Sequence, residues 1–62
     1  MTIAEYNRQV LTWREVAKDR HGYTQKELAK RIGCCESALS HKRTLYALPY
    51  YQVKRLEELA NG

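Results

Sequence analysis

The sequence has little of what stabilises small secreted or membrane-bound proteins. Its only two cysteines, Cys34 and Cys35, are adjacent, and neighbouring cysteines cannot join distant parts of a chain by a disulfide. No apolar run approaches the ~20 residues that a membrane-spanning helix needs, and residues 1–15 lack the apolar segment of a signal peptide. We therefore expect a cytoplasmic protein with no membrane association.

The chain is also short. Sixty-two residues suffice for one small domain, residues 1–62, and exclude the large enzyme folds. A chain of this size buries only about 60% of its unfolded surface, so a second subunit would help to stabilise its core. Repeats and low-complexity tracts are absent. We expect no effector domain, no ligand pocket, no small-molecule substrate and no cofactor.

Positive charge is concentrated in the middle of the chain. The net charge is +4, and residues 20–43 hold six Lys or Arg against two Glu, whereas the remaining residues hold five of each sign. Such a local excess suits a phosphate backbone or an acidic membrane surface. On charge alone, a solvated surface that keeps the protein soluble is an equally good interpretation.

Helical patterns cover nearly the whole chain, and strand alternation is absent. Thr2 with Glu5, and Thr24 with Glu27, have the spacing of capping boxes that begin two helices. Gly22 is placed to end the first of these helices and Gly33 the second. The predicted fold is a compact all-α domain with four helices at about 3–20, 25–32, 36–44 and 50–60. Apolar residues at helical spacing predict the buried faces: Ile3, Tyr6, Val10, Trp13 and Ala17, then Leu28, Ala29 and Ile32, then Ala38 and Leu39, and finally Val53, Leu56, Leu59 and Ala60.

The predicted helix 36–44 has an unusual outer face. Ala38 and Leu39 point inward with Lys42 between them, and residues 45–48 form a loop before Pro49, which is placed to open the last helix. The outer face carries small and polar side chains rather than the Glu and Lys pairs of an ordinary solvated helix: Glu36, Ser37, Ser40, His41 and Thr44. This face is typical of a surface that contacts a partner.

Residues 24–44 resemble the helix-turn-helix of the phage repressor and Cro family. The resemblance rests on Gln25 opening a helix, Ala29 four residues later, Gly33 four beyond that and Leu39 six beyond the glycine. The sequence departs from the family at Lys42, where an apolar residue is usual, and at Cys35, where a Ser or Thr usually caps the second helix.

The resemblance implies sequence-specific binding to double-stranded DNA, with helix 36–44 in the major groove. It implies a homodimeric transcriptional regulator, a phage or prophage repressor or Cro-like protein acting in a bacterial cytoplasm or at its nucleoid. The family's base-contacting positions match Glu36, Ser37, Ser40 and His41, and its phosphate-binding positions match Gln25, Lys26, Lys42, Arg43 and Thr44, with Arg31 as a further candidate. The alternative is a small helical interaction module, such as an antitoxin or adaptor.

Other roles remain open for several of these side chains. Gln25 can simply complete the start of its helix, Glu36 can favour a helix N-terminus, and Lys30 and Arg31 suit an ordinary surface. Tyr46, Tyr50 and Tyr51 can cover the core, form a dimer surface or contact phosphates.

Neither a metal site nor an enzyme is expected. Zinc would have to use Cys34, Cys35, His21 and His41, but structural zinc sites space their cysteines two to four apart, so Cys34 is better placed as a small core residue. Ser40 and His41 are consecutive, and consecutive helical residues point about 100° apart, so they form no catalytic pair.

Overall fold

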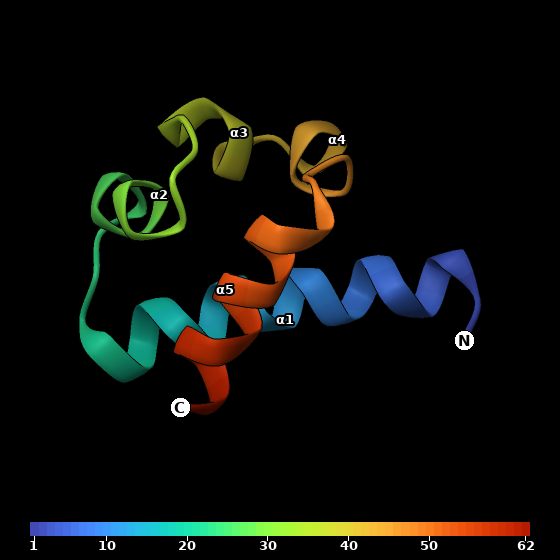
Figure 1. Cartoon of the computed structure of the whole chain (residues 1–62), viewed down its shortest axis with the longest axis horizontal. Coiled ribbons are helices and arrows are strands. Elements are labelled where there is room, and N and C mark those ends of the chain that lie inside the picture. The colour runs from blue at the N-terminus through green and yellow to red at the C-terminus, as the bar shows by residue number, and fades with distance from the viewer.

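A computed structural model describes all 62 residues, with five α-helices and no strand. The helices are α1 (Ile3–His21), α2 (Gln25–Ile32), α3 (Glu36–Ser40), α4 (Lys42–Leu45) and α5 (Tyr50–Asn61). The short helices α2, α3 and α4 lie on one side of the long helix α1, and α5 runs back from α4 to cross α1 (Figure 1). The molecule measures 29 × 22 × 17 Å, and the prediction of a compact all-α chain is confirmed.

The boundaries of α1 and α2 follow from local sequence. The hydroxyl oxygens of Thr2 and Thr24 accept hydrogen bonds from the backbone N–H groups of Glu5 and Glu27, each at 3.1 Å. Both helices end at a glycine in the left-handed conformation, with φ of +68° at Gly22 and +93° at Gly33, which a side chain with a Cβ adopts only at a cost. The predicted starts and ends of these two helices are therefore confirmed.

The capping boxes are only half formed. Neither glutamate carboxylate reaches back to the backbone N–H of its threonine. Glu5 instead accepts a hydrogen bond from the Thr2 hydroxyl at 3.1 Å, and Glu27 lies 3.7 Å from the Arg31 guanidinium, one helical turn away. The expectation of reciprocal capping was wrong on this point because both exposed carboxylates find other partners.

The hydrophobic core is built mainly from the predicted faces. Ten apolar residues are buried, and nine of them were predicted to point inward: Val10, Ala17, Leu28, Ala29, Ile32, Leu39, Val53, Leu56 and Ala60. Tyr6, Trp13 and Leu59 are partly buried against this core. Ile3 is 80% exposed, contrary to expectation, because it opens the end of α1 that projects past the other helices (Figure 1).

The predicted single helix 36–44 is two helices, which corrects the count from four to five. His41 has extended backbone angles, φ −97° and ψ +126°, and separates α3 from α4. Leu39 and Leu45 are both fully buried, but positions six apart on one helix lie about 120° apart around its axis. The break allows both leucines to enter one core, and it leaves Lys42 exposed rather than facing inward.

The tenth buried core residue also differs from the prediction. Leu45, expected in a loop, is the last residue of α4 and has no exposed surface. The start of α5 agrees with the prediction, since the helix begins at Tyr50, directly after Pro49 at its N-cap. None of the helices combines the length and the apolar character that crossing a membrane requires.

Candidate nucleic-acid interface

α3 presents its polar side chains to solvent while its one buried residue anchors it. Leu39 is fully buried, whereas Glu36, Ser37 and Ser40 are exposed, as is His41 at the end of the helix. These four residues, here called the α3 surface, were predicted to lie on one outer face. Their exposure is confirmed, although the surface spans one short helix and its junction rather than a continuous helix to Thr44.

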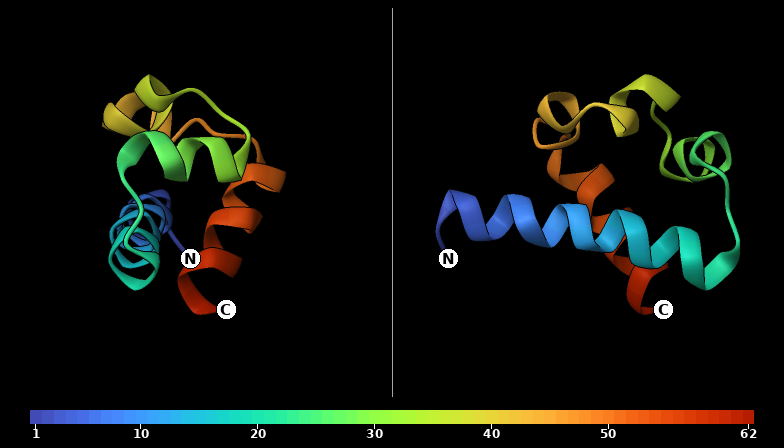
Figure 2. Two further views of the ribbon diagram at one scale, coloured as in Figure 1. Left: turned by 90° about the vertical axis from the view of Figure 1, so that its left-hand side faces the viewer. Right: turned by 180° about the vertical axis from the view of Figure 1, so that it is seen from behind.

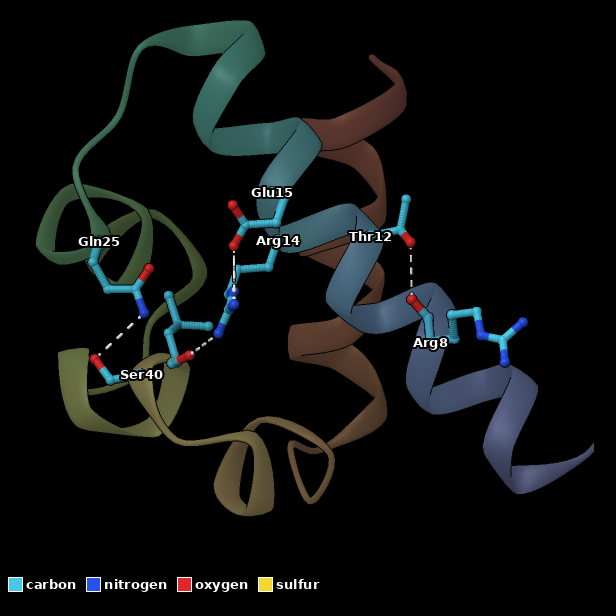
Figure 3. Close-up of polar contacts among 7 residues, drawn as sticks. Arg8, Thr12, Arg14, Glu15, Gln25 and Ser40 are labelled. Carbon is cyan, nitrogen blue, oxygen red and sulfur yellow. Dashed lines mark hydrogen bonds and ion pairs between the residues drawn. The ribbon is translucent and has the colours of Figure 1, made fainter.

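Two side chains hold the C-terminal end of α3. The guanidinium of Arg14, on α1, donates a hydrogen bond to the carbonyl oxygen of Leu39 at 2.7 Å (Figure 3). The hydroxyl of Thr44 lies 3.0 Å from the carbonyl oxygen of Ala38. These contacts occupy carbonyl groups that the break at His41 deprives of helical partners. Sequence reasoning missed Arg14, since nothing in the local pattern links it to a residue 25 positions away.

Arg14 is fixed in turn by its neighbour. Its Nη2 lies 2.9 Å from the Glu15 carboxylate, and only 15% of the Arg14 side chain is exposed. A charged donor to a backbone carbonyl is among the stronger protein hydrogen bonds. α1 therefore sets where α3 ends.

Gln25 joins the start of α2 to the α3 surface. Its Nε2 donates a hydrogen bond to the Ser40 hydroxyl oxygen at 3.3 Å (Figure 3), and that hydroxyl donates to the carbonyl oxygen of Glu36 at 3.1 Å. The structure thus brings together a predicted phosphate-binding residue and a predicted base-contacting residue. Gln25 Oε1 is shielded from solvent and has no hydrogen-bond partner.

Three exposed cations lie in sequence beside this contact. Lys26 follows Gln25, and Lys42 and Arg43 follow the α3 surface directly. The molecule's two ion pairs are Arg14 with Glu15 and Arg31 with Glu27, so none of these three cations has a carboxylate partner. Unpaired cations around a polar helix surface suit a polyanion.

Thr44 is already engaged within the chain. Its hydroxyl lies 3.0 Å from the carbonyl oxygens of Ala38 and His41 and 3.4 Å from that of Ser37. A hydroxyl has one proton to donate, so a contact from Thr44 to a phosphate would compete with the α3–α4 junction. Its role as a phosphate ligand stays a prediction.

The turn between α2 and α3 is held from α5. Gln52 is buried, and its Nε2 donates a hydrogen bond to the carbonyl oxygen of Gly33 at 3.0 Å. Cys35 is the N-cap of α3 and makes no capping hydrogen bond, as expected for a poor acceptor. Cys34 packs against the core, and its partial burial, with a smaller contribution from Cys35, raises the pKa of its thiol.

No known family model, curated protein or solved structure matches this chain. What the α3 surface binds must therefore be inferred from its own chemistry.

The three tyrosines near the start of α5 differ in burial. Tyr46 packs on the core, whereas Tyr50 and Tyr51 are 73% and 63% exposed.

No group of three or more His, Cys, Asp or Glu side chains is arranged to hold a metal ion. An open pocket of about 450 Å³, which the sequence did not predict, lies among α1, α2 and α5.

Proposed function

We propose that this protein is a sequence-specific DNA-binding regulator of the phage repressor and Cro type. α2, the turn at Gly33 and α3 would form its helix-turn-helix, with α3 in the major groove. The observation that carries the proposal is the exposed polar α3 surface flanked by Lys26, Lys42 and Arg43, three cations with no carboxylate partner.

The chemistry of the α3 surface matches that of base edges. Glu36 can accept a hydrogen bond from the amino group of cytosine, and Ser37 and His41 can each donate or accept. Ser40 is small enough for close approach to a base, and its contact with Gln25 would hold the first turn of α2 near the adjacent phosphate. Lys26, Lys42 and Arg43 would supply affinity without sequence preference.

In this proposal the protein acts as a homodimer. Two copies would place their α3 helices in successive major grooves about 34 Å apart, so that the operator has two half-sites. Regulation would come from occupancy, by blocking polymerase or a competing regulator at overlapping sites.

The deciding experiment is selection from a random duplex library followed by binding measurements at several salt concentrations. We expect a two-half-site motif and, for six phosphate contacts from two copies, a log–log salt slope of about −5. A duplex affinity that does not change between low and physiological salt would refute the proposal. It would favour the interaction module, for which the exposed Tyr50 and Tyr51 offer a protein-binding surface.

Single substitutions separate base contacts from phosphate contacts. Glu36→Ala and His41→Ala are each expected to change the preference at one base position by about 1–3 kcal/mol. Lys26→Ala is expected to weaken all sequences alike and to reduce the salt slope, while Lys54→Ala, on α5, serves as the matched control. Recovery of the same motif by the wild type, Glu36→Ala and His41→Ala would contradict the base-contact assignment.

A further inference from the structure

The pocket lies on a part of the molecule that the proposed DNA contacts do not use. Its walls come from the end of α1 and the turn after it, from α2, from α5 and from the residue after α5: His21, Tyr23, Arg31, Arg55, Glu58, Leu59 and Gly62. No residue of α3 or α4 contributes. Figure 2 shows α2 lying across from the C-terminal ends of α1 and α5. At about 450 Å³, the pocket falls within the range that small-molecule sites occupy.

One of its two arginines, Arg31, contacts two neighbouring side chains. The guanidinium carbon of Arg31 lies 5.4 Å from the centre of the Tyr23 ring, and its Nε lies 3.7 Å from Glu27. Tyr23 stacks on His21 with ring centres 5.0 Å apart, and His21 Nε2 lies 2.8 Å from the carbonyl oxygen of Leu59. Residues of α1, α2 and α5 therefore meet on the side of the pocket where Arg31 lies.

The second arginine has free hydrogen-bonding capacity. Arg55 takes part in neither ion pair of the molecule, although Glu58 lies one turn further along the same helix and lines the same pocket. The Arg55 Nη1 would be 3.8 Å from a Cβ placed at Gly33, so this guanidinium lies beside the end of α2. Two guanidinium groups that line one pocket can bind the oxygens of a phosphate or carboxylate together.

We propose that this pocket binds a small phosphate monoester that carries a hydroxyl group, such as a sugar phosphate. Arg31 and Arg55 hold the phosphate. The Glu58 carboxylate repels a bare dianion but accepts a hydrogen bond from a ligand hydroxyl, and Tyr23 with Leu59 covers the carbon skeleton. This site does not depend on the proposed function, because the DNA contacts proposed above use none of its residues; Arg31, a candidate for DNA phosphate from the sequence, is assigned to the pocket instead.

The test is an NMR titration of the ¹⁵N-labelled protein at constant ionic strength with ribose 5-phosphate, inorganic phosphate and ribose. We expect saturable shifts at the pocket residues that are strongest with ribose 5-phosphate, weaker with inorganic phosphate and absent with ribose. Arg55→Gln should weaken ribose 5-phosphate binding by about tenfold or more, since a charged donor is lost. Lys54→Gln removes the same charge from the neighbouring exposed position and should change the affinity by less than about twofold.

Two outcomes of these titrations would contradict parts of the proposal. Shifts that do not saturate, or equal weakening by Lys54→Gln and Arg55→Gln, would refute the site and indicate general attraction to a basic chain. Glu58→Gln should reduce the preference for ribose 5-phosphate over inorganic phosphate, and an unchanged preference would refute the role of Glu58.

A duplex titration distinguishes a small ligand from the DNA backbone as the source of the phosphate. We expect Arg55→Gln to leave duplex affinity unchanged. A loss as large as that of Lys26→Ala would assign the pocket to a DNA phosphate and overturn the small-ligand assignment. Because the first titration contains no DNA, its failure leaves the proposed function standing.

Discussion

The hydroxyl of Thr44 lies within 3.0–3.4 Å of three carbonyl oxygens where α3 gives way to α4. Thr44→Val keeps the shape of the side chain but removes this donor, leaving the carbonyl of Ala38 without a partner from the chain. We expect the free energy of unfolding to fall by about 1–2 kcal/mol, measured by urea denaturation.

Thr12→Val is the matched control for this prediction. The Thr12 hydroxyl donates to the carbonyl oxygen of Arg8 at 2.9 Å within the intact helix α1 (Figure 3), a carbonyl that is already part of a regular helix. The control should change stability by less than about 0.5 kcal/mol. Equal losses in the two variants would show that Thr44 has no special role at the junction.

The adjacent cysteines differ in their surroundings, and they should therefore differ in reactivity. Cys35 is exposed, whereas Cys34 is partly buried, and burial together with Cys35 raises the pKa of Cys34. A raised pKa leaves less of the reactive thiolate at any given pH. We expect iodoacetamide to label Cys35 before Cys34 near neutral pH, as followed by peptide mass spectrometry; faster labelling of Cys34 would contradict this.

The same shift makes a small contribution to stability that depends on pH. The folded state holds the Cys34 proton more tightly than the unfolded state does, so the contribution is complete below the pKa of the unfolded thiol. It is lost as the pH rises through the higher pKa of the folded thiol. Replacing Cys34 with alanine should therefore flatten the alkaline decline in unfolding free energy, whereas Cys35→Ala should flatten it less.

At the scale of elements, one side chain of α1 forms a hydrogen bond to the end of α3. Arg14 donates to the carbonyl oxygen of Leu39 at 2.7 Å from a largely buried position. Arg14→Met retains most of the apolar stem and removes the charged donor, so the unfolding free energy should fall by about 1.5–3 kcal/mol. Arg8→Met, at an exposed position on the same helix, should cost less than about 0.5 kcal/mol.

A further variant separates this bond from the ion pair beside it. The Glu15 side chain is 58% exposed, and exposed ion pairs contribute about 0–1 kcal/mol. Glu15→Gln should therefore cost much less than Arg14→Met in the same denaturation series. A Glu15→Gln loss as large as that of Arg14→Met would place the stabilisation in the ion pair and not in the contact with α3.

The elements that the sequence predicts well are those whose ends are determined locally. Thr2, Thr24, Gly22 and Gly33 lie within one turn of the groups that they cap, so their spacing alone locates α1 and α2. The break at His41 depends instead on the burial of both Leu39 and Leu45. It also depends on a hydrogen bond from a residue in α1, and neither feature appears in a local pattern.

In the candidate site, too, the features that depend on local sequence were predicted, and those that depend on helix packing were not. The exposure of Glu36, Ser37 and Ser40 follows from their position on an amphipathic turn, and it was predicted. The contact between Gln25 and Ser40 joins residues fifteen positions apart, and the pocket joins residues from three helices. Both arise only from how the helices pack, which a single sequence does not specify.

At the scale of the whole molecule, the cations beside the α3 surface and the exposed tyrosines lie on different elements. Unpaired Lys26, Lys42 and Arg43 lie on α2 and α4 beside the α3 surface. The exposed tyrosines, Tyr50 and Tyr51, open α5. In the proposed dimer, the charged elements would face DNA, and the tyrosines would be free to contact the second copy, where tyrosine is favoured.

This separation predicts a variant that loses assembly but not folding. Because both side chains are largely exposed, the double variant Tyr50→Ser with Tyr51→Ser should change the free energy of unfolding of the isolated chain by less than about 1 kcal/mol. It should shift binding on a selected two-half-site duplex from two copies toward one, as measured by sedimentation equilibrium. Tyr46→Ser, which removes a ring packed on the core, should instead cost about 1–3 kcal/mol of stability. If the double variant still binds as two copies with unchanged affinity, the tyrosines do not form the dimer contact, and the second copy must use another surface.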